Sequence, residues 1–285
     1  MTTITVLHPG EMGAAVAAQA VLRGHRVLWV DAGRSAATRD RASAAGLEAV
    51  SALGPALGSS DVVLSICPPA YANEVARAVA AHGFRGIYVD ANAISPSRAS
   101  EIASVIAEAG GTPLDGSIIG PPPGGSTGAR LYLSGDSGTG ARVVELFTET
   151  TVDARLLDRP IGAASALKMA FASYQKTART LVGLAHGLAD EHGVTDQLVE
   201  EGKKMAGPLL ADRDYLGSVA RRAWRWDAEM LEIAAALDEA NLPADLARAT
   251  AEVLGRWAPL KDARPSAADA IEYLHTAKPS VGGHP

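Results

Sequence analysis

The residues from His8 to Gly13 form a turn that could hold the phosphates of a nucleotide. They follow an apolar, β-branched run and precede a run of helix-forming residues. Gly10 and Gly13 match the second and third glycines of the dinucleotide-binding fingerprint, with Glu11 and Met12 between them. Gly10 would let a pyrophosphate approach the backbone and the positive end of the helix, and Gly13 would let the helix pack closely on the strand.

His8 departs from this fingerprint, because it stands where a first glycine usually shapes the turn. The chain has 29 glycines, so a glycine pattern alone is weak evidence. Its place after the first strand of an alternating strand–helix pattern makes it much more specific. We therefore predict that this turn binds NAD or NADP, with a purely structural turn as the alternative.

The residues after the second predicted strand would select between the two dinucleotides. Asp31 stands where a carboxylate bonds to the adenosine ribose and repels a 2′-phosphate, which favours NAD. Arg34 and Ser35 follow at the start of a helix, and together with its N-terminus they suit a 2′-phosphate. The alternative is that Ser35 only caps the helix and the arginines are solvated. We favour NADP.

Short strands alternate with amphipathic helices in the first half of the chain. This pattern is typical of βαβ units and predicts an α/β Rossmann domain with a parallel sheet. The expected strands cover residues 4–7, 26–30, 62–66, 87–89, 113–114, 130–133 and 154–157, and the expected helices cover residues 11–22, 70–82, 96–109 and 138–149.

The strand pattern ends near Pro160. We therefore predict two domains, a Rossmann domain over residues 1–160 and an all-helical domain over residues 161–285. Apolar residues from Leu167 to Leu188 recur at spacings of three and four. This periodicity predicts a long helix that links the two domains.

Composition excludes several classes of protein. The 285 residues are 47% hydrophobic and carry a net charge of −6, which fits a folded protein and argues against bulk electrostatic binding of nucleic acid. The N-terminus lacks a secretory signal pattern, and no apolar run reaches the roughly 18 residues of a membrane span. We expect a cytoplasmic protein without a membrane partner. The single cysteine and the scattered histidines show no metal-ligand spacing, so we expect no metal site.

Four segments of the chain together resemble the β-hydroxyacid dehydrogenase and 6-phosphogluconate dehydrogenase superfamily, in the family's order and over nearly the whole length. They are residues 10–13, 90–96, 114–120 and 162–168. Residues 120–123 and 222–230 resemble a branch that has its own all-helical C-terminal domain. The resemblance implies an NAD(P)-dependent oxidoreductase that acts on a small molecule and forms homodimers through the helical domains.

The resemblance also assigns roles to single residues. Lys168 corresponds to the catalytic lysine, which would give a proton in reduction or take one in oxidation at a C–OH/C=O centre. A helical lysine is usually solvated, but Lys168 lies in an otherwise apolar segment. Cys67 and Pro68 match the place where the family's chain passes beneath the cofactor. Asn92 falls where the family usually has a serine that touches the nicotinamide region.

The chain departs from the family pattern near the lysine. Ala172 replaces an asparagine that helps to position the substrate. We expect the hydroxyl of Ser173 or Tyr174 to take over this hydrogen bond. The alternatives are a serine bonded within its own helix and a tyrosine that packs along it.

The segment that holds a substrate carboxylate in the family differs as well. Ile119 has no side-chain donor and Pro121 has no N–H, which puts a small hydroxy acid bound in the usual way in doubt. Gly120 begins a stiff, proline-rich turn that could wall the pocket, and Ser117 remains as a donor. In the helical domain, Trp226 could line the pocket of the partner subunit or pack in the core.

These observations favour an NAD(P)-dependent dehydrogenase or reductase in which Lys168 relays the proton. An imine reductase that acts on C=N is the alternative: such enzymes typically lack the lysine, whereas the altered carboxylate segment is in its favour. A nucleotide-binding dimer without catalysis is the alternative of another class, suggested by His8, Ile119 and Ala172.

Overall fold

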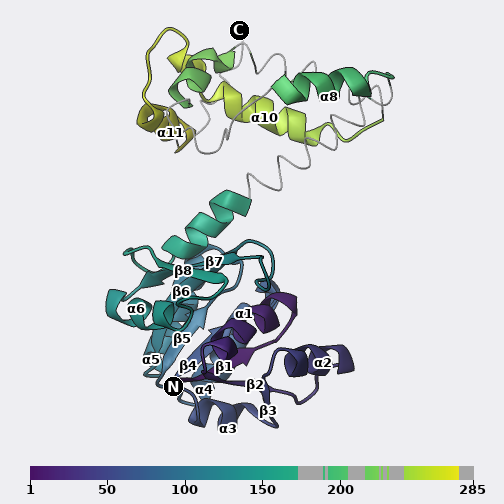
Figure 1. Ribbon diagram of the computed structural model, residues 1–285. Coiled ribbons are helices and arrows are strands. Elements are labelled where there is room, and N and C mark those ends of the chain that lie inside the picture. Colours follow the sequence, from purple (N-terminus) through teal and green to yellow (C-terminus); the bar gives the residue numbers. More distant parts are fainter. Residues whose placement is uncertain are drawn as a thin grey trace. The chain divides into compact units, whose positions relative to one another are not determined.

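The computed structural model describes residues 1–172, 189, 192–204, 216–224, 226, 230 and 241–275. The chain divides into two compact units, Met1–Ala172 and Ser173–Pro285 (Figure 1). Each unit is described by itself below.

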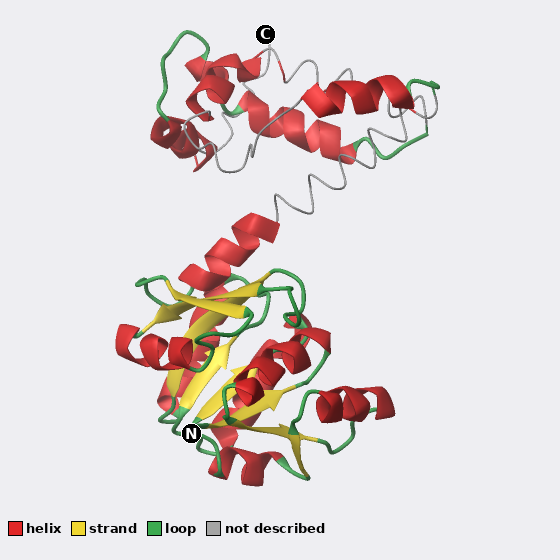
Figure 2. Ribbon diagram, viewed as in Figure 1, coloured by secondary structure: helices red, strands yellow, loops and turns green. Residues whose placement is uncertain are grey.

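The first unit is built on one eight-stranded sheet (Figure 2). The strand order is β3-β2-β1-β4-β5-β6-β7-β8, and neighbouring strands are parallel except for β6 and β7. The strands are β1 (Thr3–Leu7), β2 (Arg26–Val30), β3 (Glu48–Val50), β4 (Val62–Ser65), β5 (Ile87–Asp90), β6 (Thr112–Ile119), β7 (Ala129–Gly135) and β8 (Val152–Leu156). The first six follow the order of a doubly wound dinucleotide-binding sheet.

Helices cover both faces of this sheet (Figure 2). One hydrophobic cluster joins α1, α2 and the region of α6 to one face, and a second joins α3, α4 and α5 to the other. The helices are α1 (Glu11–Leu22), α2 (Ala36–Ala44), α3 (Leu53–Gly58), α4 (Ala72–Ala81), α5 (Pro96–Glu108) and α6 (Ser137–Glu145), with a short 3₁₀ turn, η1 (Pro69–Tyr71). Burial on both faces explains why a central strand such as β4 is buried along its whole length.

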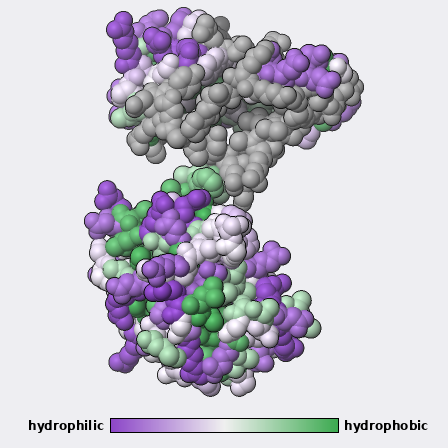
Figure 3. Space-filling model, viewed as in Figure 1, coloured by the Kyte–Doolittle hydropathy of each residue, from purple (hydrophilic) through white to green (hydrophobic). Residues whose placement is uncertain are grey.

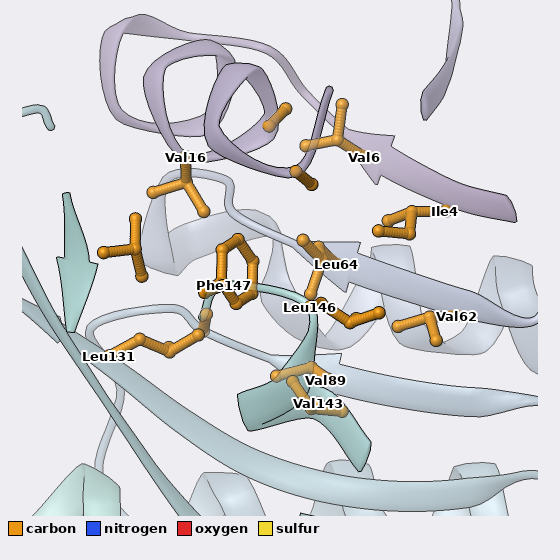
Figure 4. Packing of buried hydrophobic residues seen from close by; sticks show 14 of the residues in the cluster. Ile4, Val6, Val16, Val62, Leu64, Val89, Leu131, Val143, Leu146 and Phe147 are labelled. Carbon is orange, nitrogen blue, oxygen red and sulfur yellow. The ribbon is translucent and has the colours of Figure 1, made fainter. Parts of the chain in front are cut away.

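Aliphatic side chains from strands and helices fill the first of these clusters. Figure 4 shows the ring of Phe147 close to Val16 of α1, Leu64 of β4 and Leu131 of β7. The outer surface differs: the face of the first unit in Figure 3 is mostly hydrophilic or neutral, with hydrophobic residues in small patches. The predicted α/β Rossmann domain is confirmed.

Two details of the sheet differ from the prediction. The strand Glu48–Val50 and the helix Leu53–Gly58 were not expected, because three and six residues are too short for a periodic pattern to stand out. The sheet is not wholly parallel, since β7 runs against β6. The connection between these two strands contains a turn in which Gly124 and Thr127 exchange both backbone hydrogen bonds at 2.9 Å.

A buried carboxylate fastens the chain that follows β8 to the sheet. Asp115 on β6 is 2% exposed, and its Oδ2 accepts hydrogen bonds from the Gly162 N–H (2.9 Å), the Ser165 N–H (3.0 Å) and the Ser134 hydroxyl (2.9 Å). Its Oδ1 accepts from the Ser165 hydroxyl at 2.6 Å. Ser134 accepts in turn from the Ala164 N–H at 3.1 Å. These contacts pair the N–H groups at a helix start with a negative charge.

This anchor accounts for where the first unit ends. Residues 163–172 are helical, and their start is bonded to β6 and β7, so they belong to the first unit. The division between the units therefore falls after Ala172, whereas the sequence pattern placed it near Pro160. The remainder of the predicted linking helix, from residue 173 to about 191, lies almost entirely outside the described residues.

The described part of the second unit is helical, as predicted. Its named elements are α8 (Thr195–Lys204), α10 (Asp245–Gly255), η2 (Ala258–Leu260) and α11 (Ala267–His275), and residues 216–224 are helical as well. A hydrophobic cluster that includes Ala220, Leu254 and Trp257 holds these helices together. The indole N–H of Trp257 donates to the Ala270 carbonyl at 2.7 Å, which satisfies its buried polar group.

No described helix is long and apolar enough to cross a membrane. No group of three or more His, Cys, Asp or Glu side chains within the described ranges could hold a metal ion.

We predict that Asp115→Ala lowers the free energy of unfolding by about 3 kcal/mol, because it leaves several buried donors without an acceptor. Asp115→Asn keeps one acceptor oxygen and should lose about half as much. Urea denaturation followed by circular dichroism measures both. Asp153→Asn is the control, since Asp153 is exposed on β8 and bonds only Arg155 among the described residues. A loss for Asp115→Ala no larger than for the control would contradict the anchor.

Candidate functional site

The strand order brings the predicted cofactor residues to one edge of the sheet. In a parallel sheet the carboxyl ends of the strands meet at the same edge, and ligands bind where the strand order reverses. Here the order reverses between β1 and β4. The segments that leave the sheet at this edge are residues 8–13 after β1, 31–35 after β2, 66–68 after β4 and 91–92 after β5.

The turn from His8 to Gly13 has the shape that a pyrophosphate needs. A Cβ at Gly13 would lie 2.7 Å from the His8 carbonyl oxygen, so only glycine fits there. A Cβ at Gly10 would meet no atom within 4 Å, which leaves the entry to the backbone open. Gly10 caps α1 without any side-chain hydrogen bond, so no side chain covers the N–H groups of Glu11 and Met12 at the helix start.

His8 adopts the backbone conformation of the first glycine that is missing from the fingerprint. His8 has φ 67°, the left-handed region that glycine adopts freely and other residues rarely do. His8 thus makes the turn that the fingerprint assigns to glycine. The turn is held from the side by Arg41 of α2, whose Nη1 donates to the Pro9 carbonyl at 3.2 Å.

Some of the residues after β2 make hydrogen bonds within the chain, whereas the side chain of Arg34 is left to bind a ligand. Ser35 caps α2, with its Oγ accepting from the Thr38 N–H at 3.3 Å, so the capping interpretation of Ser35 holds. The carbonyl of Asp31 accepts from the Arg34 N–H at 3.2 Å and from the guanidinium of Arg39 at 3.4 Å. The guanidinium of Arg34 is half-buried and has no hydrogen bond or ion pair with any part of the chain that the structure describes.

Asn92 braces the ends of β4 and β5. Its Oδ1 accepts from the Cys67 N–H at 2.6 Å, and its Nδ2 donates to Ser65 Oγ and Asp90 Oδ2, both at 3.1 Å. The side chain is 3% exposed and bonded at both ends. Asn92 therefore holds the Cys67–Pro68 segment in place, and its predicted contact with the nicotinamide region stays a prediction.

Two titratable groups beside this brace are shifted toward their neutral forms. Burial raises the pKa of the Asp90 carboxyl to about 6, and the charge of Asp115 adds to the rise, although hydrogen bonds from Asn92 oppose it. Burial, together with the charge of Asp90, raises the pKa of the Cys67 thiol to about 11. The thiol is therefore protonated at neutral pH and is a poor nucleophile.

Lys168 lies one turn beyond the residues that Asp115 holds. Its half-buried ammonium donates to the Ile118 carbonyl at 2.6 Å, near the carboxyl end of β6. This contact fixes the head group at the same edge of the sheet as the glycine turn. The predicted catalytic lysine is thus attached to the first unit.

Two of the predicted substrate residues lie close by on β6 and just after it. Ser117 is fully buried, and its hydroxyl has no hydrogen-bond partner within the described ranges. It shares the face of β6 that carries Asp115, because side chains alternate along a strand. Gly120 has φ 130°, and a Cβ there would lie 3.1 Å from the Gly128 carbonyl oxygen, so this turn requires glycine.

The other three predicted substrate residues belong to the second unit. Ser173 and Tyr174 lie outside the described residues. Trp226 belongs to the second unit, where it packs against the hydrophobic cluster and the Arg222 guanidinium lies 5.4 Å from its ring centre. Its contact with substrate stays a prediction.

Sequence reasoning did not single out Asp115 as the anchor of the lysine helix. A detectable signal was present, namely one carboxylate inside an otherwise uncharged strand. Its partners Gly162 and Ser165 are separated from it by 47 and 50 residues, so this pairing is a tertiary contact.

We predict that the Asp90 carboxyl makes stability depend on pH. Its pKa is raised in the folded state, so its contribution is complete below about pH 4 and is lost as the pH rises through about 6. Asp90→Asn lacks this change. Between about pH 4 and pH 7 the unfolding free energy of the natural chain should fall by about 2 kcal/mol relative to that of Asp90→Asn.

Urea titrations at several pH values measure this difference. Asp136→Asn is a control of opposite sign, because hydrogen bonds from Thr139 lower the pKa of Asp136. A difference between the natural chain and Asp90→Asn that does not vary with pH would count against the assignment.

Comparisons with known proteins agree with this geometry. The family described as "NAD binding domain of 6-phosphogluconate dehydrogenase" matches residues 3–155, and a "Domain of unknown function (DUF1932)" matches residues 189–257. An uncharacterised 28.5 kDa protein of Methanothermus fervidus is 28% identical over 206 residues, which covers 70% of this chain and 77% of that protein.

Solved structures share the fold. The imine reductase from Myxococcus stipitatus in complex with NADP+ has a TM-score of 0.75 at 18% identity, and covers 95% of this chain and 99% of its own. A variant of that enzyme in complex with NAD+ has a TM-score of 0.74 at 17% identity, covering 96% and 99%. The family match spans more than half of the 285 residues, including the glycine turn and the strands from β1 to β6. The chain therefore belongs to the family defined by the NAD binding domain of 6-phosphogluconate dehydrogenase, joined to a DUF1932 domain.

Proposed function

We propose that this chain transfers hydride between NAD(P) and a C–OH/C=O centre of a small molecule, with Lys168 as the proton relay. The observation that carries the proposal is the position of the Lys168 ammonium. It is held by the Ile118 carbonyl at 2.6 Å, at the edge of the sheet where the dinucleotide turn lies.

The first unit supplies groups that suit a dinucleotide. The N-terminus of α1, from Gly10 to Gly13, would take the pyrophosphate, and Arg34 would take a 2′-phosphate. When bound, the nicotinamide supplies or accepts the hydride. The brace made by Asn92 keeps Cys67 and Pro68 in a fixed position along this edge.

Lys168 supplies the proton chemistry. In reduction its ammonium gives a proton to the oxygen that gains negative charge, and in oxidation its amine takes the proton of the hydroxyl. The Asp115 anchor keeps the lysine helix on β6, so the head group has a fixed starting point. The buried hydroxyl of Ser117, which has no hydrogen-bond partner among the described residues, is a further donor on the same strand.

The substrate class follows from what the carboxylate segment lacks. The Ile119 side chain has no donor and Pro121 has no backbone N–H, so the segment lacks both of these donors for a small hydroxy acid. We infer a substrate that does not depend on a carboxylate at this segment. Ser173, Tyr174 and Trp226 remain proposed substrate contacts, and we propose that the helical units form a homodimer.

Reduction of C=N is the second candidate. The fold that the chain shares with the imine reductase from Myxococcus stipitatus supports it, as does the missing carboxylate grip at Ile119 and Pro121. Lys168 favours the C=O reaction instead, because enzymes that reduce C=N typically lack a lysine at this position. A dimer that binds the nucleotide without catalysis is the candidate of another class.

The test mixes the protein with NADPH and a panel of carbonyl and imine substrates and follows the loss of reduced-nicotinamide absorbance. We expect turnover of carbonyls, and Lys168→Ala should lower kcat by at least about 100-fold because the proton donor is gone. Lys168→Arg keeps the charge but not the proton transfer, so it should stay impaired. Turnover of imines alone would support the second candidate, and nucleotide binding without any turnover would support the third.

We also predict that NADPH binds more tightly than NADH at equal salt, because Arg34 meets the 2′-phosphate. Calorimetric titration of Arg34→Gln should show at least about tenfold weaker NADPH binding and NADH binding within about twofold. Arg39→Gln is the matched control, since the Arg39 guanidinium donates to the Asp31 carbonyl. Tighter binding of NADH by the natural chain would reverse the assignment.

A further inference from the structure

His8 combines two features that cost stability. It is one of four residues other than glycine with positive φ among the described residues, and its φ of 67° would cost a glycine nothing. Its carbonyl oxygen is also the atom that forbids a side chain at Gly13. The backbone here needs the conformation of His8 but has no need of its side chain.

The second cost lies in the imidazole ring. Its Nδ1 is one of four buried side-chain polar atoms that lack a hydrogen-bond partner within the described ranges. The other three belong to Tyr88, Ser117 and Thr151, and only His8 lies in the glycine turn. A buried polar atom without a partner is unfavourable, so a group outside the chain is the natural partner.

The guanidinium of Arg34 supplies a positive charge that acts on the His8 ring. It acts both on His8, at the end of β1, and on Cys67, at the end of β4. That charge therefore reaches the point where the strand order reverses, and neither a carboxylate nor a carbonyl of the described chain pairs with the guanidinium.

Burial and the charge of Arg34 together lower the pKa of His8 to about 4, although a hydrogen bond with the Leu7 backbone opposes the change. The imidazole is therefore neutral at pH 7. In the tautomer that carries its proton on Nδ1, this atom can donate one hydrogen bond to a ligand oxygen. The cation in this corner is then Arg34, and His8 supplies a neutral polar contact beside it.

We propose that the side chain of His8 is a ligand contact, in which Nδ1 hydrogen-bonds an oxygen of the adenosine diphosphate portion that NADH and NADPH share. The inference rests on the proposed function, because it takes a dinucleotide as the ligand. It explains why a histidine stands where glycine would fit the backbone without strain. The side chain supplies binding energy that glycine cannot.

Two substitutions separate the ring from the backbone. His8→Gly removes the ring and relieves the left-handed conformation, so the variant folds without new strain. His8→Asn accepts the same conformation and places an amide nitrogen or oxygen as many bonds from the backbone as Nδ1. Calorimetric titration with NADPH, NADH and ADP measures the affinity of each variant, and thermal unfolding without ligand measures its stability.

We expect His8→Gly to be as stable as the natural chain and yet to bind all three ligands about threefold to tenfold more weakly, the effect of one lost hydrogen bond. His8→Asn should stay within about twofold of the natural affinities. Unchanged or tighter binding by His8→Gly overturns the inference, and so does a loss confined to NADPH, which would move the contact to the 2′-phosphate. If the natural chain binds none of the three ligands, the proposed function itself fails.

Discussion

The carboxylate of Asp115 is the contact on which the candidate site depends. It sits inside the sheet, 2% exposed, and accepts hydrogen bonds from the backbone and hydroxyl groups that begin the helix over residues 163–172. A buried negative charge is tolerated only when donors surround it, and a helix start offers such donors together with a favourable dipole. The carboxylate and the helix therefore stabilise each other. Because Lys168 stands one turn further along, the same contact sets where its ammonium can reach.

The edge at the carboxyl ends of the parallel strands brings together hydrogen-bond donors, a positive charge and a bracing side chain. The start of α1 offers uncovered N–H groups, Arg34 offers a cation, and Asn92 closes the ends of β4 and β5. Each is placed by a strand end, and the strands are held by cores on both faces of the sheet. Rigid strands thus position loops that would not hold these groups alone.

Much of the first unit could be predicted from the sequence, because its signals are local. The helix expected over residues 11–22 is α1 with the same bounds, since a glycine turn and a run of small helix formers mark its start and course. The short strand β3 and the reversed direction of β7 could not be predicted, because three residues carry no period and pairing direction is a tertiary property.

Part of the candidate site could also be predicted from the sequence, and part could not. The positions of the glycine turn and of Lys168 could be read from residue types and from a resemblance. The hydrogen-bond partners of the side chains in the site could not be read in this way. The acceptor of the Lys168 ammonium is a backbone carbonyl 50 residues away, and two partners of Asn92, Ser65 and Cys67, lie at the end of β4 and just after it. Whether side chains such as His8 and Asp115 have hydrogen-bond partners is decided only by the folded structure.

The state of Cys67 has a chemical consequence for the whole edge. It is the single cysteine of the chain, and its pKa of about 11 leaves almost no thiolate at neutral pH. Peroxides and alkylating reagents attack the thiolate, so the end of β4 resists both. The edge where the cofactor is expected is therefore a poor target for both classes of reagent.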